Sequence, residues 1–362
     1  MKPKEIIRTC ALFRRFPNLE GKIPWIGFGI FPTPIQQLKK IGERAGTENL
    51  WVKREDLSAE IYGGNKIRKL EFTLADARSR DAQKILTFGG IGSNHVLATT
   101  IYARSLGMNT AAVLTPQPAN KFVRRNLRAY AHYGTEVIYL KNMLLAPKLL
   151  PKYLKFRASK TYILPPGGSN IRGTLGFVSC VCEICEQVEK GLMPEPKYIW
   201  VAGGSGGTVA GLLLGVKLCG MKSKIKVVRV VGPFMLTENI IAAQANKAAE
   251  LLNKLDPEIP RVSFEPEDID LLKGYLGAGY GHITAESEKA IELMEELEGI
   301  HLEYTYTGKT AAAMLRNIPY KPKAATLFIN TYNSRNLWAN IPESLDLSSL
   351  PKPLREIAAG KD

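Results

Sequence analysis

KYIWVAGGSGGTVAGLLLGVKL, from Lys197 to Leu218, is the stretch that decides the fold. Its first part, YIWVA, is rich in β-branched and aromatic residues and predicts a buried strand. The run TVAGLLLGVKL predicts a helix that begins at Thr208, directly after the glycine-rich loop GGSGGT. Free amide groups and the positive end of the helix converge in that loop, so it favours an anion such as phosphate. For this loop alone, a glycine-rich turn without a ligand is the alternative.

The same change from strand to helix recurs along the chain. Strands are expected within residues 49–55, 84–90, 110–116, 135–140, 197–204, 226–234 and 325–332, and helices within residues 65–80, 93–107, 120–134, 208–220 and 284–299. This alternation is typical of parallel sheets with crossover helices on both faces. Because 362 residues are many for one core, we predict an α/β fold of two lobes. Each lobe would be an open, mostly parallel twisted sheet flanked by helices, with the ligand in the cleft between them. We place residues 1–69 and 186–362 in a large domain and residues 70–185 in a small domain.

The composition excludes several classes of protein. A hydrophobic content of 45% with 32 glycines fits a globular protein, and no apolar run approaches the roughly 18 residues that span a bilayer. The first residues, MKPKEIIRTCALFRRF, lack the apolar core of a secretory signal. Five cysteines, an odd number, favour a reducing compartment, so we expect a cytoplasmic protein.

Two further features could indicate a metal or a nucleic acid. Cys180, Cys182 and Cys185 lie close together, but no fourth ligand is apparent nearby, so we expect small buried side chains and no metal. The formal charge is +15, and residues 121–160 contain ten Lys and Arg against one acid, Glu136. This segment lacks the pattern of an RNA-binding sheet or a zinc finger, so we favour a solvated basic face over a nucleic-acid site.

One lysine stands in an unusual setting. Lys66 lies in GGNKIRKLEF, residues 63–72, and a second small polar run, GGIGSNH, covers residues 89–95. A lysine acts as a nucleophile only where its neutral form is accessible, through burial or a cationic neighbour. The preceding glycines allow close approach of a ligand, and Arg68 and Lys69 would oppose protonation of the amine. For Lys66 alone, a surface lysine at the start of a helix is the alternative.

Together the three runs indicate one cofactor. GGSGGT is not a Walker loop, because no lysine precedes Thr208, and it lacks the spacing of a dinucleotide-binding loop. A phosphate-binding loop without a nucleotide signature, combined with a lysine able to form a Schiff base, indicates pyridoxal phosphate.

Five motifs then occur in a fixed order: KREDL (Lys53 to Leu57), GGNKIRKLEF, GSNH, GGSGGTVAGL and YTGK (Tyr306 to Lys309). In this set and order they resemble the 1-aminocyclopropane-1-carboxylate deaminase and D-cysteine desulfhydrase family. That family belongs to the fold-type II, tryptophan synthase β-like pyridoxal phosphate enzymes. The similarity begins at PTPI, Pro32 to Ile35, and covers most of the chain.

The resemblance implies a role for each matching residue. Lys66 would form the Schiff base and act as the base at Cα, with Asn65 beside it. Ser93 would meet the substrate carboxylate, and Asn94 would bond the phenolic oxygen of the cofactor. Tyr280 and Tyr306 would be active-site tyrosines, although ordinary packing is the alternative for either one alone. The phosphate loop would comprise Gly204, Ser205, Gly206, Gly207 and Thr208.

Thr307 would face the pyridine nitrogen, where the deaminases of this family have Glu, as in YEGK. A neutral hydroxyl stabilises a protonated ring nitrogen less than a carboxylate does, which favours α,β-elimination over opening of a cyclopropane ring. Three departures affect the substrate side. One is the run SAEIY, residues 58–62, which would place Glu60 and Tyr62 near the lysine. The family's GIQSNH is GIGSNH here, with Gly92, and its late HTGG is NTYN, Asn330 to Asn333, where Tyr332 would narrow the pocket.

We therefore expect a pyridoxal phosphate-dependent lyase that acts on a small amino acid and resembles D-cysteine desulfhydrase, releasing pyruvate, hydrogen sulfide and ammonia. A reaction like that of 1-aminocyclopropane-1-carboxylate deaminase, or β-replacement on another β-substituted amino acid, is the enzymatic alternative. The alternative of another class is a catalytically weak cofactor- or nucleic-acid-binding protein. We expect a homodimer without a membrane partner.

Overall fold

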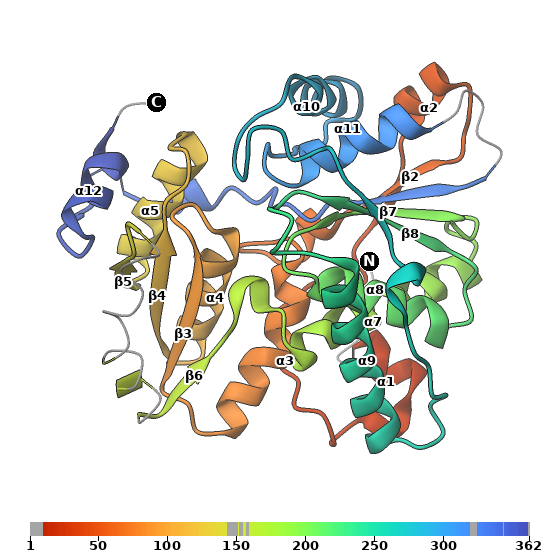
Figure 1. Ribbon diagram of the computed structural model, residues 1–362, viewed down its shortest axis with the longest axis horizontal. Coiled ribbons are helices and arrows are strands. Elements are labelled where there is room, and N and C mark those ends of the chain that lie inside the picture. The colour runs from red at the N-terminus through yellow and green to blue at the C-terminus, as the bar shows by residue number, and fades with distance from the viewer. Residues whose placement is uncertain are drawn as a thin grey trace, which may run out of the picture.

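The computed structural model describes residues 10–142, 151, 155–156, 159–318, 324–342 and 344–360. Its strands form two sheets that lie side by side (Figure 1). The larger sheet has the order β1-β2-β10-β7-β8-β9, in which β1 pairs antiparallel with β2 and the other pairs are parallel. The smaller sheet has the order β5-β4-β3-β6, and its pairs are parallel. The larger sheet consists of β1 (Ile35–Gln37), β2 (Leu50–Lys53), β7 (Tyr198–Gly203), β8 (Lys224–Arg229), β9 (Asp270–Leu272) and β10 (Thr326–Ile329). The smaller sheet consists of β3 (Lys84–Gly90), β4 (Asn109–Thr115), β5 (Glu136–Tyr139) and β6 (Thr161–Ile163).

Helices cover both faces of the larger sheet (Figure 1). Trp200 and Val228 face one core, and Ile199 and Val227 face the other, so adjacent residues of a strand are buried on opposite sides. The helices over the first face are α2 (Lys39–Ala45), α10 (Ala285–Glu298) and α11 (Thr307–Asn317). Those over the second face are α1 (Ala11–Arg15), α7 (Ile171–Glu189), α8 (Gly207–Leu218) and α9 (Glu238–Leu255). Short 3-10 turns are η1 (Pro17–Leu19), η2 (Glu55–Leu57), η4 (Pro166–Gly168), η5 (Pro266–Asp268) and η6 (Leu337–Asn340).

The smaller lobe has a core of its own, which α4 (Asn94–Ser105), α5 (Lys121–His132) and α12 (Lys352–Ala359) build together. The C-terminal helix α12 packs against α5 at the edge of this lobe (Figure 1). Helix α3 (Lys66–Ser79) belongs to both cores, because Leu70 packs in the smaller lobe and Phe72 packs in the larger one. The helix that begins with Lys66 is therefore held between the lobes.

The predicted fold class is confirmed: both sheets are mostly or wholly parallel and are flanked by helices. The three-residue strands β1, β6 and β9 were not predicted, because so few residues show no clear period. All four strands of the smaller sheet lie within residues 70–185, but α7 crosses residue 185 and packs against α8 of the larger lobe. The proposed domain limits stay a prediction.

The structure also bears on the metal and membrane expectations. All five cysteines are free and buried, and Cys182 Sγ lies 3.7 Å from Cys219 Sγ. Within the described ranges, no group of three or more His, Cys, Asp or Glu side chains could hold a metal ion. In the same part of the chain, no helix is long and apolar enough to cross a membrane.

Candidate active site

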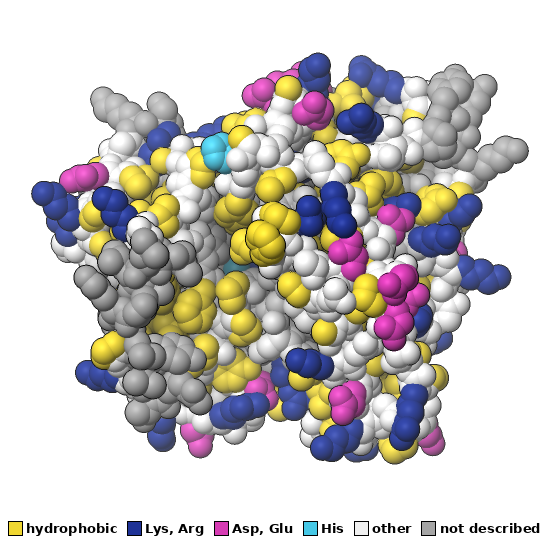
Figure 2. Space-filling model, in the orientation of Figure 1, with side chains coloured by type: hydrophobic (Ala, Val, Ile, Leu, Met, Phe, Trp, Pro, Cys, Tyr) yellow, Lys and Arg dark blue, Asp and Glu magenta, His cyan; other side chains and the backbone are white. Residues whose placement is uncertain are grey.

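A pocket of about 1310 Å³ lies between the two sheets. Leu86 and Val113 line it from the smaller lobe, and Ala202 and Val231 line it from the larger lobe. On the face drawn in Figure 2, hydrophobic side chains gather around the hollow between the lobes, and Lys and Arg side chains are dispersed among acids. The predicted site residues that line the pocket are Asn65, Lys66, Ser93, Asn94, Gly204, Ser205, Gly206, Thr208, Tyr280 and Tyr306. Gly207 and Thr307 are not among its lining residues.

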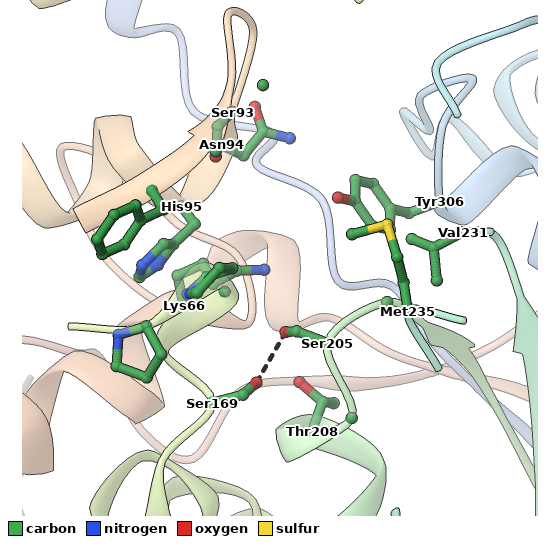
Figure 3. A pocket seen from close by; sticks show the side chains of 18 of the residues that line it. Lys66, Ser93, Asn94, His95, Ser169, Ser205, Thr208, Val231, Met235 and Tyr306 are labelled. Atoms are coloured by element: carbon green, nitrogen blue, oxygen red, sulfur yellow. Dashed lines mark hydrogen bonds between the residues drawn. The ribbon is translucent and has the colours of Figure 1, made fainter. Parts of the chain in front are cut away.

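Lys66 is the first residue of α3, and its amine points into the pocket (Figure 3). Lys66 Nζ donates to Asn65 Oδ1 at 2.8 Å, and Asn65 Nδ2 donates to Thr208 Oγ1 at 3.1 Å. Burial lowers the pKa of Lys66 to about 8, while the Glu303 carboxylate acts in the opposite direction. Near pH 8 much of the amine is therefore neutral, as a nucleophile requires.

Arg68 is not the cation beside Lys66 that the sequence suggested. Its Nε donates to Glu55 Oε2 at 2.7 Å, and its Nη2 donates to Glu183 Oε1 at 2.9 Å. Lys53 Nζ also bonds Glu183 Oε1, at 2.5 Å. Burial would raise the pKa of Glu183, but Arg68 and Lys53 lower it to about 2. This buried network ties α3 to β2 and α7 and fixes the helix that begins with Lys66.

The glycine-rich loop forms a cradle at the start of α8. Gly206 has a φ of 89°, in the left-handed region that glycine adopts most readily. Ser205 Oγ lies 2.7 Å from Ser169 Oγ (Figure 3), and Gly207 N donates to Ser169 Oγ at 3.1 Å. A Cβ atom at Gly207 would lie 3.1 Å from Lys69 Nζ. The start of α8, the hydroxyl of Ser169 and the amine of Lys69 therefore surround one small volume.

Lys69 is the basic group of this cradle and would carry its positive charge once an anion is bound. Its Nζ donates to Gly167 O at 3.0 Å and to Ser169 Oγ at 3.1 Å. Burial, and then the nearby Lys66, hold the pKa of Lys69 well below its usual value. A bound phosphate would stabilise the charged form. Ser169 was not predicted as a site residue. The run PPGGSN at residues 165–170, a second glycine and serine turn before a helix, is the signal that could have found it.

The loop GGIGSNH ends β3 and begins α4, and Ser93 and Asn94 lie at the pocket (Figure 3). Ser93 Oγ accepts from Val96 N at 3.3 Å and so caps the helix. Asn94 Oδ1 accepts from Tyr62 Oη at 3.1 Å and from Asn126 Nδ2 at 3.2 Å. Because both bonds engage the amide oxygen of Asn94, its Nδ2 remains a donor for an oxygen atom of a ligand.

Tyr280 and Tyr306 form a hydrogen-bonded pair on the larger-lobe side of the pocket. Their hydroxyl oxygens are 2.7 Å apart, and their rings meet edge to face with centres 6.0 Å apart. Lys66 Nζ lies 6.0 Å from the centre of the Tyr306 ring. Burial raises the pKa of both phenols, so both are protonated at neutral pH. The pair therefore offers a neutral hydroxyl donor to the pocket.

Glu303 lines the pocket, and Thr307 lies behind it. The Glu303 carboxylate accepts from the backbone amides of Thr305, Tyr306 and Thr307, at 2.7, 2.7 and 2.8 Å, at the start of α11. Thr307 Oγ1 accepts from Glu303 N at 2.9 Å and is 3.3 Å from Glu303 Oε1, to which it can donate. Glu303 was not predicted as a site residue, although it lies only three residues before Tyr306 of the motif YTGK, and that proximity is the signal that could have found it.

The run NTYN lies against the turn before Lys66. Asn333 Oδ1 accepts from Gly63 N at 2.7 Å, and Thr331 O accepts from Asn65 N at 3.2 Å. Tyr332 lines the pocket, in the place where the sequence led us to expect it. The departure from the family pattern therefore also builds the turn that presents the lysine.

These groups fit pyridoxal phosphate. A buried amine of lowered pKa can react with an aldehyde, the cradle of Lys69 and Ser169 suits a phosphate, and Asn94 offers a donor for a phenolic oxygen. Beside the glycine-rich loop, Gln244 Nε2 donates to Ser205 O at 3.0 Å. Gln244 Oε1 is buried and has no hydrogen-bond partner among the described residues, so it is open to a polar ligand.

Comparison with known proteins gives the same answer. Residues 26–331 match the model of a family described as pyridoxal-phosphate dependent enzyme. The chain is 31% identical to a protein whose structure is described as an ACC deaminase homologue, with a TM-score of 0.73 over 88% of this chain and 94% of that one.

Two more distant structures share the fold alone. A fungal L-serine ammonia-lyase from Rhizomucor miehei is 17% identical, with a TM-score of 0.57 over 85% of this chain and 96% of that one. A pyridoxal 5'-phosphate-dependent aspartate racemase is 18% identical, with a TM-score of 0.59 over 92% of this chain and 97% of that one. The cofactor predicted from the sequence is confirmed, and with it the type of fold. The chain belongs to the family of pyridoxal-phosphate dependent enzymes, in its fold-type II group.

Proposed function

We propose that this protein is a lyase that catalyses α,β-elimination of a small amino acid with a β leaving group, with D-cysteine as the first substrate to test. The observation that carries the proposal is the Lys66 amine, with a pKa lowered to about 8, inside a pocket that also holds a phosphate cradle. Pyridoxal phosphate, when bound, supplies the electron sink that makes the Cα proton of an amino acid acidic.

The side chains of the pocket can perform the remaining steps. Lys66 is the base placed to remove the Cα proton, since Lys69 is bonded in the cradle and Glu303 is bonded at the start of α11. The Tyr280 and Tyr306 hydroxyls are neutral donors that can protonate a departing group. Ser93 is the N-cap residue of α4, where its hydroxyl can bind the carboxylate of the substrate.

Thr307 favours elimination over ring opening. Its hydroxyl bonds Glu303 behind the lining of the pocket, so Thr307 would act on the ring nitrogen through Glu303 and not by direct contact. The Glu303 carboxylate beside it is already bonded by three backbone amides, which offset its charge. A hydroxyl holds a positive ring nitrogen less strongly than a carboxylate would, and this suits a reaction in which the leaving group departs soon after deprotonation.

Ring opening of 1-aminocyclopropane-1-carboxylate and β-replacement are the enzymatic alternatives, and the 31% identity to the ACC deaminase homologue favours testing the first of them. A weak cofactor- or nucleic-acid-binding protein is the alternative of another class. The basic segment 121–160, which would be its nucleic-acid-binding face, lies partly outside the described residues.

For the location and assembly of the protein, we propose a cytoplasmic homodimer.

A screen of D- and L-amino acids for pyruvate and ammonia release tests the proposal. D-Cysteine should yield pyruvate, ammonia and sulfide in equal amounts. Release of 2-oxobutyrate from 1-aminocyclopropane-1-carboxylate would show a deaminase instead. If no amino acid reacts and the protein is retained on DNA or RNA in a salt-sensitive way, the binding protein replaces the lyase.

The lowered pKa of Lys66 predicts how capture of the cofactor depends on pH. In the cofactor-free protein, the rate of covalent capture of pyridoxal phosphate should rise with pH and level off above about pH 8, because the neutral amine is the reactive form. A lysine with the ordinary pKa of about 10.4 would show a rate that still rises at pH 10. In Glu303→Gln, the midpoint should move to lower pH, because Glu303 raises the pKa of Lys66. Stopped-flow absorbance measures this rate. An unchanged midpoint in Glu303→Gln would show that Glu303 does not act on the pKa of Lys66.

A bulky residue in the cradle should weaken retention of the cofactor. Gly206→Val places its side chain against Gln244 and imposes a left-handed φ of 89° on a β-branched residue. We expect a cofactor dissociation constant raised by about 10-fold or more. Gly220→Val is the matched control, because Gly220 has a φ of 68° and open space around it, outside the pocket. Equal loss of cofactor in both variants, measured by ultrafiltration with circular dichroism for folding, would assign the effect to backbone strain.

A further inference from the structure

The amide of Gln117 fills a slot between glycines at the edge of the pocket. Gln117 follows β4, and its Oε1 accepts from Gly92 N at 3.2 Å. A Cβ atom at Gly90 would lie 2.2 Å from Gln117 Oε1, and one at Gly92 would lie 2.9 Å from Gln117 Nε2. A Cβ atom at Gly281, next to Tyr280 on the other lobe, would lie 3.9 Å from the same nitrogen.

The backbone does not explain glycine at positions 90 and 92. Neither residue has a positive φ, so a side chain would be compatible with the backbone at both. The space that a side chain would need is taken by Gln117 and, at Gly92, also by Val123, whose Cγ2 would lie 2.8 Å from the added atom. Gln117 and the two glycines are therefore complementary.

Gln117 lies next to the groups that face a substrate. The loop to which it bonds continues directly into Ser93 and Asn94, which line the main pocket. Gln117 itself lines a small adjoining cavity of about 30 Å³, whose wall is shared with the main pocket through Asn94, Tyr280, Glu303, Tyr306 and Tyr332. With its oxygen bonded to Gly92 N, the amide nitrogen of Gln117 is presented on the side of Gly281 and Tyr280.

We propose that Gln117 is a positioning and specificity residue for the carboxylate of an amino-acid substrate. Its oxygen holds the loop that presents Ser93, and its nitrogen adds a hydrogen-bond donor where Gly92 carries no side chain. Ser93, Asn94 and Gln117 then form one neutral set of donors, which suits a carboxylate that enters beside the Lys66 amine. The inference rests on the proposed amino-acid substrate but not on elimination.

Binding of amino acids without a leaving group tests this directly. The holoenzyme is titrated with D-alanine, L-alanine and ethylamine, and the absorbance change of the bound cofactor gives a dissociation constant for each. In Gln117→Ala, the constant for the alanine enantiomer that binds should rise by about 10-fold, the loss expected for one hydrogen bond to a charged group. The constant for ethylamine, which has no carboxylate, should stay within about 2-fold. Equal weakening for alanine and ethylamine would show a general packing role and overturn the proposal.

Gln117→Glu separates the two halves of the side chain. Its carboxylate still accepts from Gly92 N, but it places a negative charge beside the incoming carboxylate and offers no donor. Alanine binding should therefore weaken more than in Gln117→Ala, with ethylamine binding unchanged or tighter. Alanine binding equal to that of the wild type would contradict the proposal.

Moving the amide from position 117 to position 92 should restore the alanine binding that is lost in Gln117→Ala. In a Val123→Ala background, Gly92→Gln alone should weaken alanine binding, because the new side chain meets Gln117. Gly92→Gln combined with Gln117→Ala should bind alanine more tightly than either single variant does. Absence of rescue would contradict complementarity between the two positions. Alanine binding with no pyruvate from any amino acid would refute the lyase and leave this inference standing, whereas a wild type that binds neither enantiomer would contradict both.

Discussion

Lys66→Ala is expected to abolish turnover and to remove the covalently held cofactor. The amine of Lys66 points into the pocket, and burial lowers its pKa to about 8. Replacement by alanine removes both the nucleophile and the base, so we expect the rate of product release to fall by at least about 1,000-fold. Absorbance of the bound cofactor and a pyruvate assay measure the two effects.

Lys66→Arg is the matched variant for this prediction. It retains a long cationic side chain at the start of α3, but a guanidinium is not deprotonated in proteins and cannot take the role of a neutral amine. Lys66→Arg should fold like the wild type and be as inactive as Lys66→Ala. Activity of Lys66→Arg above a few per cent of the wild type would show that the amine is neither nucleophile nor base.

Lys69→Met should produce the second large effect, on affinity for the cofactor. The variant removes the cation of the cradle and retains most of the apolar stem, so the dissociation constant for pyridoxal phosphate should rise by about 10- to 100-fold. Affinity for pyridoxal, which has no phosphate, should change little. Equal losses for the two compounds, measured by fluorescence quenching of the cofactor-free protein, would place the phosphate elsewhere.

The pKa of Lys69 adds a dependence on pH. Because burial and Lys66 lower that pKa well below its usual value, binding of a phosphate dianion should be coupled to uptake of a proton. The dissociation constant of inorganic phosphate, measured directly on the cofactor-free protein, should therefore rise with pH once the phosphate is fully a dianion, and Lys69→Met should lose this dependence. A dissociation constant for inorganic phosphate that does not change with pH over this range in the wild type would mean that Lys69 is already fully charged.

Local pattern predicted most of the fold. The strand, loop and helix from Lys197 to Leu218 occur as β7, the loop and α8, because an apolar run and a glycine-rich turn need no distant partner to be recognised. Strands β6 and β9 have three residues each and gain their place by pairing with β3 and β8. Helix α12 joins the smaller lobe through α5, far away in sequence. Such contacts leave no local period.

The candidate site divides in the same way. Lys66, Asn94 and the glycine-rich loop lie in short motifs, and the structure brings them to one pocket. Burial is the main cause of the lowered pKa of Lys66, and the degree of burial of one side chain cannot be read from a short motif. Arg68 is paired with Glu55 and Glu183, so its position next to the lysine in sequence was misleading.

The remaining groups of the site are visible only in three dimensions. Ser169 meets Ser205 across the cradle, at 2.7 Å. Glu303 bonds Thr307 at the start of α11, which gives the threonine a partner that the motif YTGK does not reveal. Gln117 occupies the space beside Gly92, which explains in physical terms why that position can be glycine.

Reduction of the holoenzyme with borohydride, followed by peptide mass spectrometry, tests the central claim most directly. The reagent fixes the cofactor to the amine that holds it, so the modified residue can be read from the fragment spectrum. We predict one adduct, on Lys66, in the peptide that begins after Arg54 or Lys53, and none in Lys66→Arg. An adduct on Lys69, Lys309 or any other lysine of the wild-type protein would contradict the assignment of the active site.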